Sequence, residues 1–224
     1  MDNQPTAYSL TTHRQSRAFA ALAVLALPVI ITALPGRYQL MPRGIPFIAA
    51  AILAIPMIAA GFAPDSLFWR RAERYTAAIL LPIGAFTELT LLALLLRDMA
   101  KVHSGISGLT LLSTSIAIWL QNILIFALAY WQIDRGGPAG RIGGWTGRTD
   151  FSFPRGDPSD NVPEDWQPIF ADYLSLAFNT SAAFSPTDVL PLRPRAKMMM
   201  MVQSIISLIT VIAVGARAIN ILGS

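Results

Sequence analysis

The chain has 224 residues, of which 54% are hydrophobic and 13% are charged, whereas about 25% of the residues in an ordinary soluble domain are charged. This composition argues against a free-standing soluble domain and excludes a disordered chain, which would be poor in apolar residues. Because the chain has no cysteine and two histidines, disulfides and thiolate sites are excluded, and we expect no metal site or other cofactor.

Five apolar runs approach the roughly 20 residues that a helix needs to cross a bilayer. They cover residues 18–34, 45–63, 76–96, 109–131 and 198–222. A lone span in lipid must satisfy its own backbone hydrogen bonds, so each run is predicted to be an α-helix. The net charge of +4 does not indicate nucleic-acid binding, because the Lys and Arg residues lie between the apolar runs, as membrane-flanking charges do.

Polar side chains interrupt two of these runs. Glu88 lies in the middle of the third run, where a carboxylate is costly and therefore suggests a functional site. Two interpretations are open: a protonated Glu88 that hydrogen-bonds a neighbouring helix, or the working carboxylate of a small transporter. Gln121 and Asn122 lie midway along the fourth run and are predicted to form hydrogen bonds between helices.

A polar stretch rich in Gly, Pro and Asp, at 133–167, follows the fourth run. Loops of this length in compact proteins are usually functional or mobile. The apolar part of the next segment, 169–178, is too short to cross a bilayer and is typical of a re-entrant or interfacial helix. Asn179, Thr180 and Ser181 favour caps and turns, so this helix is predicted to end there and to lead into an irregular polar strand. Irregular backbone at membrane depth is tolerated only where protein buries it or water lines it.

This order of span, short helix, irregular strand and span resembles the pore module of the tetrameric cation channels. In the potassium-channel family, an Asp early in the pore helix stands sixteen residues before the Asp that follows the filter, and Asp172 and Asp188 have that spacing. Phe178 and Thr180 fall on the family's pore-helix Phe and Thr, and Pro191 stands three residues after Asp188.

The resemblance implies two regions. Residues 1–107 would be an N-terminal membrane region with three transmembrane helices, and residues 108–224 a pore-like module. The module would consist of an outer helix, a long extracytoplasmic loop at 133–167, a pore helix and filter-like strand at 168–191, and an inner helix at 197–222.

The resemblance breaks at the five filter positions. The family has Thr-Val-Gly-Tyr-Gly, and this chain has Ala183, Phe184, Ser185, Pro186 and Thr187. The potassium filter points a row of backbone carbonyls at the ion, and glycine permits the dihedral angles that this row needs. Side chains at 185 and 187 make a positive φ costly, so we expect no potassium-selective filter. The expected ion pathway follows nine residues: Thr180, Ser181, Ala182, Ala183, Phe184, Ser185, Pro186, Thr187 and Asp188.

The roles of Asp188 and of three polar residues on the last helix each have two possible interpretations. Four copies of Asp188 would form a carboxylate ring that concentrates cations at the pore mouth, or, as in the potassium channels, each Asp188 would brace the filter from behind. Gln203, Ser204 and Ser207 lie three to four residues apart on the last helix, which places them near one face. That face either lines a wet cavity or backs the pore helix.

These features predict an all-α integral membrane protein with five transmembrane helices, and with a re-entrant pore helix and filter-like loop before the last helix. The resemblance implies a homotetramer in a bacterial plasma membrane that passes monovalent or divalent cations with weak selectivity. The alternatives are a non-conducting scaffold that binds a partner, and a small secondary transporter that uses Glu88. We expect no enzyme, because the Gly-x-Ser-Gly motif at 105–108 is followed by no histidine that could act as its base.

The two indicators of orientation disagree. The resemblance places the N-terminus and the long loop outside and the C-terminus in the cytoplasm. The positive-inside rule favours the opposite orientation, because more Lys and Arg residues would then flank the cytoplasmic ends of the spans. We adopt the orientation that the resemblance implies.

Overall fold

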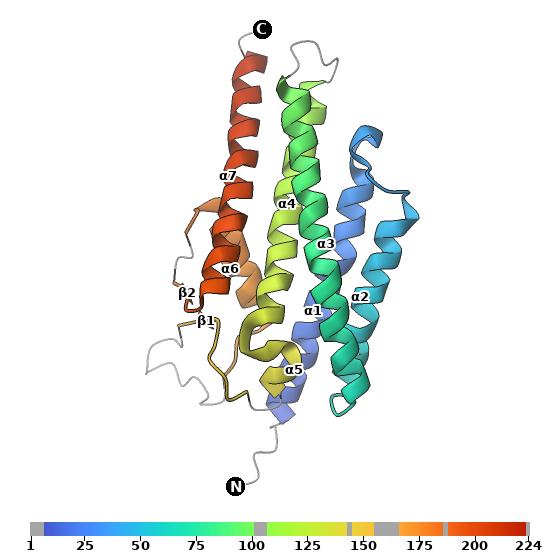
Figure 1. Ribbon diagram of the computed structural model, residues 1–224, viewed down its shortest axis with the longest axis vertical. Helices are drawn as coiled ribbons and strands as arrows, with labels where there is room; N and C mark the ends of the chain where they lie inside the picture. The colour runs from blue at the N-terminus through green and yellow to red at the C-terminus, as the bar shows by residue number, and fades with distance from the viewer. Residues whose placement is uncertain (1–6, 101–106, 143–144, 155–165, 186–187, 223–224) are drawn as a thin grey trace.

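The computed structural model describes residues 7–100, 107–142, 145–154, 166–185 and 188–222. Figure 1 shows an elongated bundle of roughly parallel and antiparallel helices, with the N-terminus at one end and the C-terminus at the other. The end that carries the N-terminus is called the lower end here, and the opposite end is called the upper end.

The described part of the chain is almost entirely helical. In chain order its helices are α1 (Ala7–Ala33), α2 (Gly44–Phe62), α3 (Leu67–Ala100), α4 (Gly108–Ile133), α5 (Gly137–Ile142), α6 (Phe170–Ala182) and α7 (Pro194–Leu222), with 3-10 turns η1 (Gly36–Tyr38) and η2 (Asp134–Gly136). Strands β1 (Phe151–Ser152) and β2 (Leu190–Pro191) pair antiparallel. In this part of the chain α1, α2, α3, α4 and α7 are long and apolar enough to cross a membrane. The predicted all-α class and the predicted set of candidate spans are thereby confirmed.

Helices α1 and α3 extend toward the lower end beyond their predicted runs. Arg17 of α1 and Glu73 of α3 lie in or beside these extensions and form a buried ion pair with an N–O distance of 2.7 Å. Arg17 also donates a hydrogen bond of 3.2 Å to the carbonyl of Met57 in α2. The pairing between helices accommodates both charges inside the packed structure, within the extended helices.

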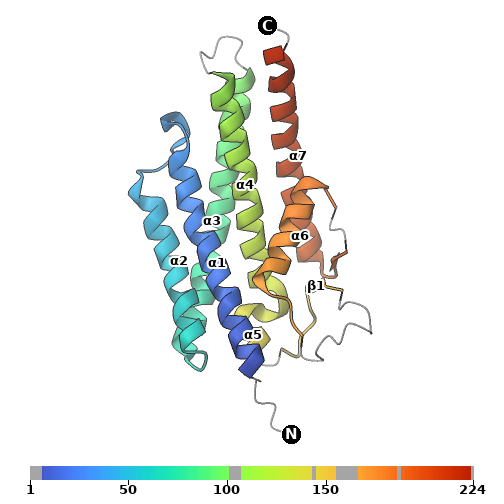
Figure 2. The ribbon, with the colours of Figure 1, turned by 180° about the vertical axis from the view of Figure 1, so that it is seen from behind.

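Helix α6 does not run the length of the bundle. It lies in the middle part of the bundle, and β2, which follows it in the chain, lies lower and pairs with β1 (Figure 1). Helix α7 begins beside β2, above the lower end of the bundle, and runs to the upper end (Figure 1). Seen from behind, α6 lies against α4 and α7 (Figure 2).

Helix α6 is anchored at its lower end by hydrogen bonding and by aromatic packing. The backbone N–H of Phe170 donates a hydrogen bond of 2.8 Å to the hydroxyl of Ser16 in α1. The rings of Phe170 and Trp131 meet edge to face at 5.8 Å, an arrangement that aromatic pairs favour. One continuous hydrophobic core joins α1, α2, α3, α4, α6 and α7, so both predicted regions share the same core.

Candidate pore-like site

The first turn of α6 is closed by Asp172. Its Oδ2 accepts a hydrogen bond of 2.7 Å from the backbone N–H of Ile169, one of the groups that a helix start leaves without an intrahelical partner. Burial raises the pKa of the Asp172 carboxyl, and this backbone hydrogen bond acts in the opposite direction. The short helix therefore begins within a residue of the predicted position.

The end of α6 lies beyond the predicted one. The helix continues through Asn179, Thr180 and Ser181 and ends at Ala182. The hydroxyl of Thr180 donates a hydrogen bond of 2.8 Å back to the carbonyl of Leu176, so it does not compete with the helix as a cap would. Ser181, the last of the three polar residues that predicted a helix end, is held in the helix by tertiary contacts.

Gln203 of α7 supplies most of these contacts. It is fully buried, and its Nε2 donates hydrogen bonds of 2.8 Å to the carbonyl of Ala177 and to the hydroxyl of Ser181. Its Oε1 accepts a hydrogen bond from the hydroxyl of Tyr130 in α4, and its backbone carbonyl accepts one of 3.2 Å from Asn122. One side chain thus joins α4, α6 and α7, and the predicted interhelical role of Asn122 is confirmed.

Ser207, one turn along α7 from Gln203, also holds the end of α6. Its hydroxyl donates a hydrogen bond of 2.6 Å to the carbonyl of Ser181 and accepts one of 3.1 Å from the indole of Trp119. Ser204 is half-buried. Within one chain, Gln203 and Ser207 back the short helix, which is the second of the two alternatives for this face.

The filter-like segment, which follows α6, begins on the surface of the helical bundle, about midway along its length. Ala182, Ala183, Phe184 and Ser185 are all exposed. Phe184 has φ of 53°, a left-handed conformation that is costly for a residue with a side chain and that often marks functional sites. The sequence argued against a positive φ at 185 and 187. In the structure the positive φ is at 184 and not at 185. Pro186 and Thr187 lie outside the described residues.

Asp172 and Asp188, sixteen residues apart in the sequence, border the same small cavity between α6 and the returning chain. The cavity has a volume of about 110 Å³, and Ser175, Asn179 and Trp166 also line it. Asp188 is exposed at its edge. This position suits the brace interpretation, because Asp188 shares the cavity with Asp172, Ser175 and Asn179 of α6. Phe178, by contrast, is half-exposed on α6 and meets the ring of Trp119 at 5.8 Å.

A buried network lies below α6, formed in part by residues of the stretch 133–167 that the sequence predicted to be a loop. Asp134 is fully buried. Its Oδ2 accepts a hydrogen bond of 2.7 Å from the Tyr173 hydroxyl, and its Oδ1 accepts one of 2.8 Å from the backbone N–H of Asp150. Arg141 packs over the rings of Trp131 and Tyr173, with its guanidinium carbon 5.4 Å from each ring centroid.

The same network ties the start of α7 to the end of α4. Arg195 binds both carboxylate oxygens of Asp150, with an Nη2–Oδ2 distance of 2.6 Å, and donates a hydrogen bond of 3.1 Å to the carbonyl of Ile133. The bidentate form of the pair fixes geometry as well as charge. The described ends of the long polar stretch are therefore part of the packed structure.

Glu88 and Gln121 are buried polar residues on neighbouring helices, in the upper half of the bundle. Glu88 of α3 is fully buried, and neither carboxylate oxygen has a hydrogen-bond partner among the described residues. Gln121 of α4 is 1% exposed, and its amide likewise finds no partner there, so its predicted interhelical hydrogen bond is not formed. Gly84 of α3 packs against Ile125 of α4. Because these helices are antiparallel, the next turn places Glu88 and Gln121 at a similar level.

Comparison with known proteins identifies no family for this chain. No family model matches the chain, and searches of curated proteins and of solved structures give no match.

Proposed function

We propose that the chain is one subunit of an oligomeric cation channel with potassium-channel-like architecture and weak selectivity. In this proposal α1, α2, α3, α4 and α7 cross a bacterial plasma membrane and α6 is a re-entrant pore helix. The lower end faces outward and the C-terminus lies in the cytoplasm. The length and apolar character of the five helices support the membrane part of the proposal.

The observation that carries the proposal is the place where α6 ends. Its C-terminal end is held against the middle of α7 by Gln203 and Ser207, and the irregular backbone of 183–185 follows on the exposed side of the chain. If α7 spans a bilayer, this backbone lies at membrane depth, where unsatisfied peptide groups cost several kcal/mol each. Irregular backbone of this kind is tolerated only against protein or water, and an aqueous pathway between subunits provides both.

An oligomer with α7 innermost would cover the exposed apolar residues of this helix. They include Met201, Ile205, Leu208 and Ile212. One filter-like segment cannot surround an ion, so several copies must meet around an axis, as closed cyclic symmetry allows. The resemblance makes that number four, with α7 innermost.

Ion flux into liposomes that contain the purified protein tests the proposal. We expect uptake of K⁺, Na⁺ and Rb⁺, and we expect Ala183→Trp to block it by filling the pathway. The matched control is Ala78→Trp, at an exposed alanine on α3, which is expected to leave flux intact. A correctly folded protein that passes none of these ions, nor Ca²⁺, would contradict the channel and favour the non-conducting scaffold.

A small secondary transporter is the second candidate, and the buried carboxylate of Glu88 favours it. A carboxylate without a hydrogen-bond partner at membrane depth is a candidate proton carrier. Glu88→Gln keeps the size of the side chain and removes its titration. Proton-coupled uptake that disappears in this variant would support the transporter, whereas the channel proposal expects cation flux to persist.

A further inference from the structure

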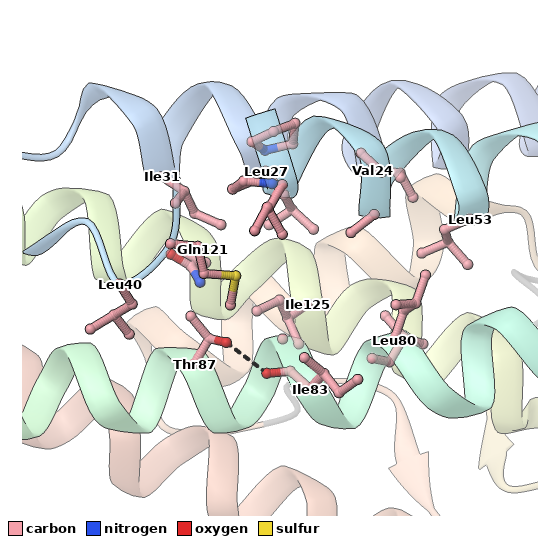
Figure 3. Close-up of a pocket in the computed structure, with 18 of the residues that line it drawn as sticks. Val24, Leu27, Ile31, Leu40, Leu53, Leu80, Ile83, Thr87, Gln121 and Ile125 are labelled. Carbon is pink, nitrogen blue, oxygen red and sulfur yellow. Dashed lines mark hydrogen bonds between the residues drawn. The ribbon is translucent and has the colours of Figure 1, made fainter. Parts of the chain in front are cut away.

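An apolar cavity lies between α1, α2, α3 and α4, away from the α6–α7 junction. Its volume is about 300 Å³, at the lower end of the range for small-molecule sites. Figure 3 shows Val24, Leu27 and Ile31 above the cavity and Leu80 and Ile83 below it. No charged side chain is among its lining residues in the described part of the chain.

Three polar side chains line this cavity, and two of them have partners. The Tyr38 hydroxyl donates a hydrogen bond of 3.0 Å to Asp98, and the Thr87 hydroxyl donates one of 2.9 Å to the carbonyl of Ile83. Gln121 is the exception, because neither its Oε1 nor its Nε2 has a partner among the described residues. Figure 3 shows its amide pointing from α4 into the space between Ile31 and Thr87.

A buried amide without hydrogen bonds is unfavourable, and the great majority of buried polar side-chain atoms are paired. A well-packed core would place an apolar residue at position 121. An amide aimed into an otherwise apolar cavity is the arrangement that ligand sites use, with apolar walls for affinity and a few polar groups for orientation.

We propose that this cavity binds an uncharged amphiphile, an apolar chain or ring with one hydroxyl or amide group that hydrogen-bonds Gln121. A hydroxyl can both accept from Nε2 and donate to Oε1, so it satisfies both sides of the amide. A charged head group is disfavoured because no lining residue compensates its charge. The volume equals roughly ten times the share of liquid volume that one water occupies, which suits a short chain or a single ring system.

The proposal does not depend on ion conduction, because the cavity lies outside the α6–α7 junction. A membrane lipid and a free small molecule share the required chemistry. A cavity that holds only water is the competing explanation, since water also hydrogen-bonds an amide.

Thermal unfolding of the detergent-purified protein with 1-octanol and with octane as probes tests the site. At roughly 100 times the dissociation constant, 1-octanol is expected to raise the Tm by about 5–10 °C, and octane by less because it leaves Gln121 unpaired. Ala49→Phe places a ring at a residue that lines the cavity and is expected to abolish the shift. Ala51→Phe, on the same helix and also half-buried but not lining the cavity, is the matched control that keeps it.

Gln121→Leu separates the polar contact from the cavity itself. This variant is expected to unfold at a higher temperature without a probe, and to respond equally to 1-octanol and octane. Intact-protein mass spectrometry distinguishes the sources: a membrane lipid gives a co-purified mass that Ala49→Phe lacks, whereas a free small molecule leaves the purified protein empty but able to bind 1-octanol. Equal responses of Ala49→Phe, Ala51→Phe and wild type would place the 1-octanol outside the cavity and would overturn the proposal. No response to 1-octanol, together with no co-purified mass in the wild type, would mean a cavity that holds only water and would also overturn it.

Discussion

The side-chain amide of Gln203 in α7 donates a hydrogen bond of 2.8 Å to the hydroxyl of Ser181, the next-to-last residue of α6. Through this contact and its hydrogen bond to the carbonyl of Ala177, Gln203 fixes how far the short helix rises along α7. The exposed segment that follows α6 therefore starts at a defined depth.

Loss of this contact should destabilise the protein. Gln203→Leu leaves the Tyr130 hydroxyl, the Ser181 hydroxyl and the Ala177 carbonyl without that partner, and buried unsatisfied groups cost about 1–3 kcal/mol each. We expect a loss of at least about 3 kcal/mol, measured by denaturant unfolding in detergent. The same substitution at Gln121, which is also buried but makes no such bonds among the described residues, is the control. If both variants unfold alike, the hydrogen bonds of Gln203 contribute little.

Assembly is the most direct consequence of the channel proposal. Crosslinking in mild detergent is expected to trap a homotetramer, because one filter-like segment per chain cannot enclose an ion pathway and closed cyclic rings are the usual solution. Ile205→Glu, on the exposed side of α7, should disrupt it, whereas Ile79→Glu, on the exposed side of α3, should not. Only monomer in the wild type would rule out this architecture.

Selectivity should be poor. Residues 182–185 and 188–189 include no glycine, and a potassium filter relies on glycine to line up its carbonyls. We expect reversal potentials in mixed KCl and NaCl to show little preference between the two cations. A strong preference for potassium would contradict the expectation and would imply carbonyl coordination without glycine.

Substitution of Asp188 tests whether this residue forms a carboxylate ring at the pore mouth or braces the filter-like segment. If four copies form a ring at the mouth, Asp188→Asn reduces cation flux, most strongly at low salt where screening is weak, and leaves the tetramer intact. We expect this result, with Asp65→Asn in the α2–α3 connection as the control. Loss of the tetramer or of thermal stability would instead support the brace, which the cavity shared with Asp172 also suits. Unchanged flux, salt dependence and assembly would contradict both roles.

Stability at high pH should depend on Tyr38. Burial, together with its hydrogen bond to Asp98, raises the pKa of Tyr38 from 10.0 to about 12. A pKa raised in the folded state means that folding favours the protonated phenol, so its contribution is complete below about pH 10 and is lost as the pH rises toward 12. Tyr38→Phe should therefore show a smaller loss of stability than wild type over that interval. Tyr75→Phe, at an exposed tyrosine, should behave as wild type does.

The sequence by itself determined the five long helices, although not where α1 and α3 begin. Long apolar runs have few ways to satisfy their backbone other than α-helix, and the runs at 45–63 and 109–131 match α2 (Gly44–Phe62) and α4 (Gly108–Ile133) within two residues. The short helix before the last span was also evident, because 169–178 is apolar but too short to cross a bilayer. These features depend on local composition and length.

Only the tertiary structure decided where the polar side chains go. Local preference ended α6 near Asn179, but Gln203 and Ser207, more than twenty residues away, hold the helix through Ser181. Arg17 and Glu73 lie outside the predicted apolar runs, yet they pair between helices, 56 positions apart in the sequence. A hydrogen bond between distant residues depends on how helices pack. For that reason the sequence could show that Gln121 and Asn122 are polar and buried, but not that Asn122 is paired while Gln121 faces a cavity.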